Sequence, residues 1–123
     1  MKRPNWILLG ALLGATFVLH AAFGVHWLEN RVSAEQLEWW ETGAFHHGVH
    51  ALAILAFGLF RKTRETSDLP GWLLFTGLLI FSTTLYVMAL GGPRWLGAVT
   101  PIGGSLLVLG WLGFAWTARE TEG

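Results

Sequence analysis

The chain has 123 residues, of which 53% are hydrophobic and only 13% are charged, about half the charged share of an ordinary soluble domain. It contains no cysteine, which excludes disulfides, thiolate metal sites and thiol nucleophiles. The formal net charge is zero, and the sequence lacks the clustered basic residues of a nucleic-acid-binding protein.

The charged residues divide the chain into long uncharged runs. Four such runs cover residues 4–28, 42–60, 69–93 and 95–118. A bilayer core about 30 Å thick needs about 20 helical residues, so each run is long enough to cross it. We therefore predict an all-α integral membrane protein, with residues 1–123 forming a single four-helix transmembrane domain. The spans are expected at about residues 5–28, 42–60, 70–91 and 95–117.

The first span follows two basic residues, Lys2 and Arg3, and carries two small residues, Ala21 and Ala22, near its end. The same order occurs in cleaved signal peptides. Here the apolar run continues to Val25, so we expect the helix to be retained.

The connection over residues 29–41 carries a helix start signal of its own. Ser33 followed by Gln36 has the spacing of a capping box, in which the two side chains satisfy free backbone N–H groups. We predict a short interfacial helix here, joined to the second span at Gly43. Thr42 is expected to cap that span.

Three histidines lie near the start of the second span. His46 and His50 are four residues apart and His47 and His50 three apart, so on a helix they form one neighbouring surface. Polar residues at the same depth occur in the first span (Thr16, His20, His26), the third (Ser82, Thr83, Thr84, Tyr86) and the fourth (Thr100, Ser105). Because polar side chains at this depth normally face a bundle interior or a cavity, we predict a polar, histidine-lined pocket. Its candidate residues are His20, His26, His46, His47, His50, Ser82, Tyr86 and Thr100.

Pro101 lies near the start of the fourth span and has no backbone N–H. Either the helix kinks there and frees the carbonyl of Gly97, or it begins there with Thr100 as N-cap. In the second case residues 95–99 form a separate segment. We favour the kink. Further along this span, Trp111 is the one tryptophan placed away from a predicted membrane interface.

Glycines recur in the spans, with Gly10 and Gly14 in the first and Gly103 and Gly104 in the fourth. Lipid provides no hydrophobic drive between helices, so close backbone approach through glycine is a main source of helix association. We expect these glycines to pack within the monomer, in preference to forming a dimer face.

The basic residues indicate the orientation. Both termini and the middle loop share one side of the membrane, with Lys2, Arg3, Arg61, Lys62, Arg64 and Arg119. The other side has only Arg31 and Arg94. We predict that both termini face the cytoplasm (N-in/C-in), which places the pocket in the outer half and the interfacial helix in the outer loop. There, Arg94 is expected to pair with Glu38 or Glu41.

Three blocks, GVHWLENRVSAEQLEWWETG, HALAILAFGL and LYVMALGGPRWLGAVTPIGG, are followed by Gly110-Trp111 and cover much of the chain. They resemble the domain of unknown function 423 family, which includes transmembrane protein 256-like proteins. The resemblance implies a small inner-membrane protein of four spans with a retained first helix, and it brings no established activity.

The positions that match the family's motifs are Gly24, His26, Thr42, Gly43, His50, Arg94, Trp95, Gly97, Thr100, Pro101, Gly103 and Gly104. The family more often has Tyr-Gln where this chain has His46 and His47. The resemblance therefore favours His26 and His50 as shared ligand candidates.

Three functions are compatible with these features. We favour a small multi-pass protein of the inner cell membrane without enzymatic activity or cofactor, an accessory or structural protein whose histidines hydrogen-bond within the bundle. It would contact the lipid bilayer and form a homo-oligomer or join a larger membrane complex. The alternatives are metal or haem binding, for example through His20 and His50, and transport of a small solute or protons by an oligomer. An enzyme is disfavoured because no acid dyad or Ser-His-Asp arrangement is visible.

Overall fold

The structure, a computed structural model, describes residues 2–119, and Met1 and residues 120–123 lie outside the described part. The elements are α1 (Trp6–Phe23), the π-helical turn η1 (Gly24–Leu28), α2 (Ala34–Thr63), α3 (Leu69–Ala89), the 3-10 turn η2 (Arg94–Ala98) and α4 (Thr100–Ala118). With α1 counted together with η1, and α4 together with η2, the described chain has 4 helices long and apolar enough to cross a membrane. The prediction of four long helices is therefore confirmed.

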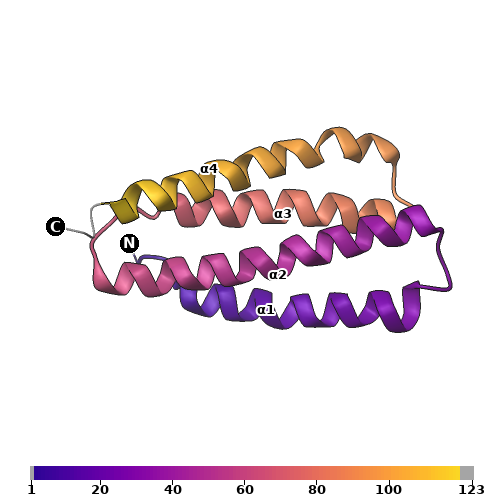
Figure 1. The fold of residues 1–123 in the computed structure, drawn as a ribbon, viewed down its shortest axis with the longest axis horizontal. Coiled ribbons are helices and arrows are strands. Elements are labelled where there is room, and N and C mark those ends of the chain that lie inside the picture. The colour runs from indigo at the N-terminus through magenta and orange to yellow at the C-terminus, as the bar shows by residue number, and fades with distance from the viewer. Residues whose placement is uncertain (1, 120–123) are drawn as a thin grey trace.

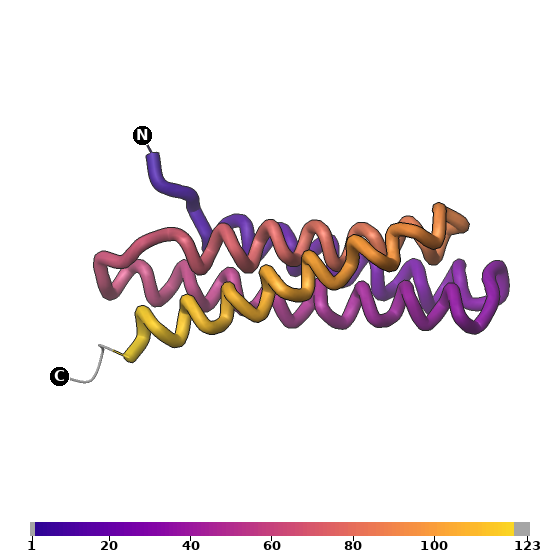
Figure 2. The backbone as a smooth tube through the Cα atoms, turned by 90° about the horizontal axis from the view of Figure 1, so that it is seen from above, coloured from indigo at the N-terminus to yellow at the C-terminus, as the bar shows by residue number. Residues whose placement is uncertain are grey.

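Consecutive helices run antiparallel and side by side, with the start of α1 and the end of α4 at the same end of the molecule (Figure 1). We call this the terminal end, and the opposite end the Arg94 end. In the most apolar window of each span, 56% of the residues of α2 and 44% of those of α3 are buried, against 11% for α1 and 22% for α4. The central pair is therefore α2 and α3. Helix α1 packs mainly on α2, and α4 packs on α3, which it crosses obliquely in Figure 2.

Two apolar clusters lie inside the bundle. The larger contains Trp6, Ala53, Ile54, Phe57, Leu74, Leu78 and Leu107, and the smaller contains Leu28, Trp40 and Ala89. In α2, the stretch between the two clusters carries His46, His47 and His50. The histidines of α2 are thus bracketed by apolar packing on both sides.

Helix α2 begins at Ala34 and continues without interruption through the residues predicted as a separate interfacial helix. The capping box is confirmed, because Ser33 Oγ accepts from the Gln36 N–H at 3.1 Å and the Gln36 side chain accepts from the Ser33 N–H at 3.0 Å. The predicted cap at Thr42 and joint at Gly43 are wrong, since both residues lie inside α2. One well-capped helix start is enough for the whole segment, and glycine only weakens a helix interior without ending it.

The fourth span does begin anew near Pro101. Helix α4 starts at Thr100 after η2, so the kink that we favoured is wrong, and Val99 occupies the cap position expected for Thr100. Proline fits the first turn because the N–H that it lacks has no partner within the helix. The Thr100 hydroxyl donates to the Leu96 carbonyl at 3.1 Å and lies 2.7 Å from Thr84 Oγ1, which ties the start of α4 to α3.

Glycines allow the closest helix contacts. A Cβ added at Gly103 would lie 2.5 Å from the backbone nitrogen of Phe81 in α3, and one added at Gly10 would lie 2.7 Å from a backbone nitrogen of α2. Gly14 and Gly104 are different, since a Cβ would meet nothing within 4 Å at the first and nothing nearer than 3.7 Å at the second. Two of the four glycines therefore lie at tight contacts within the chain.

Candidate functional site

Six of the eight predicted pocket residues line two separate grooves, and not one shared pocket as predicted. The His47 groove, between α1, α2 and α3, has a volume of about 230 Å³ and is lined by Leu13, Thr16, His20, His47, Leu78, Leu79, Ser82, Thr83 and Tyr86. The His46 groove, between α2, α3 and α4, has a volume of about 340 Å³ and is lined by Phe45, His46, Val49, His50, Phe81, Gly104, Leu107, Val108 and Trp111. His46 and His47 separate because consecutive helical residues point about 100° apart.

In the His47 groove, both nitrogens of His47 have partners. Its Nε2 lies 3.0 Å from Thr16 Oγ1, and its Nδ1 lies 2.8 Å from the Tyr86 hydroxyl. Thr16 donates its own hydroxyl proton to the Leu13 carbonyl, so Nε2–H donates to Thr16 and Nδ1 accepts from Tyr86. The imidazole of His47 in α2 thus bonds α1 through one ring nitrogen and α3 through the other.

His20 lies beside this network. Its Nδ1 donates to the Thr16 carbonyl at 2.6 Å, and its ring stacks on Tyr86 with the centroids 4.6 Å apart. Trp40 also stacks on the His20 ring, and its indole N–H donates to the His20 carbonyl at 2.7 Å. These contacts fix the position of α1 relative to α2 and α3.

In the His46 groove, His50 is only 4% exposed and also uses both nitrogens. Its Nδ1–H donates to the His46 carbonyl at 2.8 Å, and its Nε2 accepts from the Trp111 indole at 3.0 Å. His46 stacks on His50 with the centroids 5.7 Å apart and meets the Phe81 ring edge-on. The His46 Nδ1 atom is buried without a hydrogen-bond partner.

Of the remaining pocket candidates, Ser82 lines the His47 groove, and Thr100 and His26 line neither groove. Ser82 donates to the Gly43 carbonyl at 2.9 Å, which joins α3 to α2. Thr100 lies at the start of α4 and is bonded to Thr84. His26 lies in η1, is exposed and lines neither groove, so the structure does not bring it together with His50.

Most of the glycine motif positions lie against aromatic or sulfur-containing side chains. A Cβ added at Gly24 would lie 2.7 Å from the Trp40 ring, and one at Gly43 would lie 3.1 Å from the Tyr86 ring. Gly97 faces the Met88 side chain more loosely, at 3.6 Å. Trp95 and Pro101 lie on the exposed surface of the Arg94 end, and Trp95 is 66% exposed.

Arg94 pairs with Glu35, and not with Glu38 or Glu41 as predicted. Its guanidinium also lies over the Trp39 ring, 5.1 Å from the centroid. Because α2 begins at Ala34, Glu35 lies in the first turn of that helix. Glu35 is therefore the carboxylate of α2 that pairs with Arg94.

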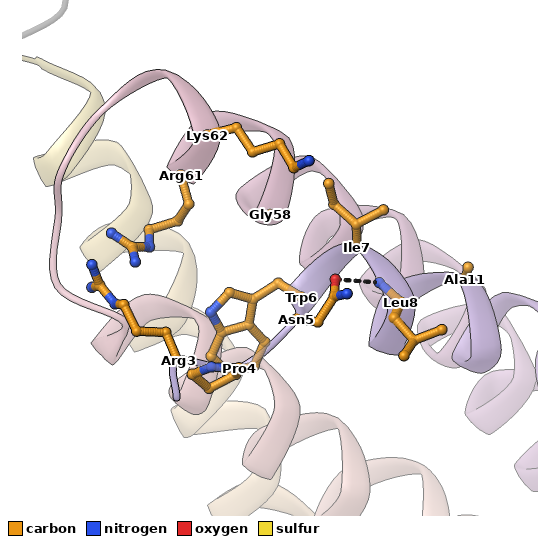
Figure 3. A pocket seen from close by; sticks show the side chains of 10 residues that line it. All are labelled: Arg3, Pro4, Asn5, Trp6, Ile7, Leu8, Ala11, Gly58, Arg61 and Lys62. Carbon is orange, nitrogen blue, oxygen red and sulfur yellow. Dashed lines mark hydrogen bonds between the residues drawn. The ribbon is translucent and has the colours of Figure 1, made fainter. Parts of the chain in front are cut away.

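Two groups of contacts were missed by the sequence reasoning. The first is the bond from Trp111 to His50, for which the position of this tryptophan inside a span was a signal. The second is an ion cluster at the terminal end, next to a pocket of about 640 Å³ between the start of α1 and the end of α2. In Figure 3, Arg3 and Arg61 point toward each other beside the Trp6 ring.

Asp68 is the centre of this terminal cluster. It accepts from the Trp6 indole at 2.9 Å and from Arg3 Nε at 3.0 Å, and its Oδ1 also lies 3.0 Å from Arg61 Nε in an ion pair. Partial burial by itself would raise the pKa of Asp68, but the hydrogen bonds from Trp6 and Arg3 and the two guanidinium charges lower it below its ordinary value. The cluster anchors the start of α1 to the α2–α3 loop.

The arrangement of imidazoles does not favour a metal or haem site. Among residues 2–119, no group of three or more His, Cys, Asp or Glu side chains is placed to hold a metal ion. His47 and His50 have no free nitrogen, while the nitrogens left over on His20 and His46 lie in different grooves. The proposed haem ligands His20 and His50 likewise line different grooves.

The bond between His47 and Tyr86 is testable by a double-mutant cycle. We expect His47→Leu and Tyr86→Phe to interact by about 0.5–1.5 kcal/mol in the free energy of unfolding, the usual range for hydrogen bonds between membrane helices. Unfolding in mixed micelles measures it. The same cycle with His26→Leu in place of His47→Leu should be additive, and additivity in both cycles would rule out the bond.

Comparison with known proteins gives a family match and several relatives. The family model described as "Protein of unknown function (DUF423)" matches residues 20–104. The UPF0382 membrane protein SSP2132 of Staphylococcus saprophyticus is 44% identical over 108 residues, which cover 87% of this chain and 90% of the relative. The UPF0382 membrane protein YwdK of Bacillus subtilis is 33% identical over 110 residues, covering 87% and 89%. No solved structure matches.

Proposed function

Because the chain belongs to the DUF423 family of unknown function, and its relatives are named membrane proteins, we propose that it is a non-enzymatic accessory or structural membrane protein. It spans the inner cell membrane with both termini in the cytoplasm. It acts as a homo-oligomer or as part of a larger membrane complex.

One observation carries this proposal: both ring nitrogens of His47 bond neighbouring helices, and His50 bonds α4 with one nitrogen and the His46 carbonyl of its own helix with the other. A catalytic base or a metal ligand needs a nitrogen that faces its substrate or ion. An imidazole that is bonded on both sides instead stabilises the relative position of the helices, as intramembrane polar pairs commonly do. These histidines therefore favour a packing role over a chemical one.

The orientation is supported by the distribution of charge. Arg3, Arg61, Lys62 and Arg64 lie together at the terminal end, while Arg94 lies at the opposite end. Basic residues near membrane helices are retained on the cytoplasmic side. Because the chain has no cysteine, single cysteines introduced at either end and labelled from outside intact cells would test the orientation directly.

The proposed function is tested on tagged protein extracted from its native membrane in mild detergent. We expect a discrete assembly heavier than the monomer, without stoichiometric metal or haem absorbance, and liposomes containing the protein should leak protons no faster than empty ones. A strictly monomeric protein would contradict the assembly role. Bound metal, haem absorbance or proton flux would instead support one of the alternative functions. In that case the signal should be lost in His50→Phe and kept in His26→Phe.

A further inference from the structure

A continuous seam runs along the junction of α1 and α2. It starts at the terminal pocket of about 640 Å³ and continues as an apolar groove of about 410 Å³, which we call the Gly14 groove and whose α1 side consists of Gly10, Ala11, Gly14 and Phe17. Ala11 lines both spaces. On α2 the lining residues recur every three or four positions and so lie on one helix face: Lys62, Gly58, Leu55, Leu52, Gly48 and Phe45.

The Gly14 groove is open to lipid and has the shape of an acyl-chain site. No residue that lines it carries a polar side chain, and Leu52 is 70% and Phe45 63% exposed. A Cβ added at Gly14 would meet nothing within 4 Å, so this glycine leaves free space in the groove instead of serving a helix contact. The face of α2 from Phe45 to Lys62 is about 25 Å long at ~1.5 Å per residue, which exceeds the roughly 15 Å depth of one leaflet.

The terminal pocket supplies positive charge at the end of this groove. It is lined by Arg3, Arg61 and Lys62 and by no Asp or Glu. Lys62 is exposed and belongs to none of the ion pairs of residues 2–119. Figure 3 shows its side chain extending from the end of α2 toward Ile7 of α1, across the seam.

The charges around the pocket leave one cation without a counter-charge. Arg3 and Arg61 share the carboxylates of Asp68 and Glu65, so these four charges balance, and the ammonium of Lys62 remains. Arg3 is 43% exposed, and its printed bonds to Asp68, Glu65 and the Thr66 carbonyl use three of its five N–H groups. One exposed ammonium and the free N–H groups of one exposed guanidinium therefore face the pocket.

A phosphodiester matches this end of the seam. It carries one negative charge, and lysine and arginine are the side chains that bind phosphate oxygens most strongly. Basic pockets between transmembrane helices bind lipid head groups in this way. A water-soluble phosphate would satisfy the cations but leave the adjoining Gly14 groove empty, whereas a phospholipid fills both.

We propose that the seam between α1 and α2 binds one anionic phospholipid, with its phosphate at Lys62 and Arg3 and an acyl chain in the Gly14 groove. The site goes beyond the accessory role, since a monomer is sufficient to form it. It also does not depend on the orientation, because the seam is complete whichever leaflet the terminal end faces.

The test is native mass spectrometry of the purified chain in mild detergent, titrated with phosphatidylglycerol or with phosphatidylcholine of the same acyl chains. We expect the first phosphatidylglycerol to bind about fivefold more tightly, as one uncompensated cation near a lipid surface allows. Equal affinity for the two lipids would overturn the proposal. Displacement of the bound lipid by millimolar inorganic phosphate would assign the pocket to a soluble phosphate and also overturn it.

A charge variant and its control test the head-group end. Lys62→Gln should weaken phosphatidylglycerol about fivefold and leave phosphatidylcholine unchanged. Arg64→Gln removes a positive charge two residues further along, from a residue that does not line the pocket, and should bind both lipids as the wild type does. An equal loss in the two variants would show diffuse attraction to the basic end of the molecule and no site.

A second pair of variants tests the acyl-chain end. Gly14→Leu fills the groove without meeting the rest of the chain, so it should weaken both lipids by a similar factor and keep the preference for phosphatidylglycerol. Gly104→Leu makes the same change on α4, outside the seam, and should leave both affinities unchanged. Binding by Gly14→Leu that equals that of Gly104→Leu would overturn the placement of the chain in the groove.

Discussion

Replacing Gly103 by alanine is expected to lower the free energy of unfolding by about 1–3 kcal/mol, through overpacking of the contact between α3 and α4. The added Cβ would lie 2.5 Å from the backbone nitrogen of Phe81 and 2.9 Å from the Gly77 carbonyl oxygen. Both are main-chain atoms, so no side-chain rotation relieves the clash. The two helices must move apart, and the packing around Leu107 must loosen with them.

The adjacent glycine provides the matched control. Gly104→Ala makes the same chemical change one residue further along α4, where the nearest contact of the new Cβ is the Phe81 ring at an ordinary 3.7 Å. Since alanine is the better helix former, this variant should be neutral or slightly stabilising. Reversible unfolding in mixed micelles compares the two variants, and equal free energies of unfolding would show that α3 and α4 do not approach as closely as described.

Replacing Asp68 by asparagine is the second change with a large expected effect. The substitution leaves the shape of the side chain nearly unchanged but removes the charge that Arg3 and Arg61 compensate. Asp68 is 16% exposed and Arg61 11%, so the loss is that of a largely buried hydrogen bond to a charged group, about 1–3 kcal/mol. Glu65→Gln is the control, because Glu65 pairs with Arg3 at 2.9 Å but is 93% exposed, and exposed pairs contribute about 0–1 kcal/mol.

The same carboxyl predicts a pH dependence. The pKa of Asp68 in the folded protein lies below its ordinary value of 3.8, so the folded state favours the ionised form. Its contribution to stability is complete above that ordinary value and is lost as the pH falls through the lower folded pKa. Thermal unfolding at stepped pH should show a difference between wild type and Asp68→Asn above about pH 4 that shrinks in stronger acid. A difference that does not change with pH would show that the charge of Asp68 contributes nothing.

Features that depend on composition and local spacing were accessible without the structure. Four helices follow from four uncharged runs of sufficient length, because a span must satisfy its own backbone and exclude charge. The capping box at Ser33 and Gln36 was also predictable, since both of its bonds lie within one helical turn. The break before α4 was visible as an alternative at Pro101, but local sequence did not discriminate between a kink and a new start.

The partners of the polar residues needed tertiary structure. Spacing placed His46, His47 and His50 on one side of a helix, yet the neighbouring helices decided that His47 would bond α1 and α3 while His50 bonds Trp111 of α4. Arg94 pairs with Glu35 because α2 begins at Ala34, eight residues before the uncharged run from which the second span was predicted.

By itself, then, the sequence determined the number of helices, their membrane character and the capped start at Ser33, since these depend on the solvent around each segment and on contacts within one turn. The division of the histidines between two grooves, the unpaired His46 Nδ1 and the cluster around Asp68 were decided by the packing of the helices. The physical reason is that a side chain in an apolar solvent bonds whichever polar group the rotation and crossing of the neighbouring helix bring within about 3 Å.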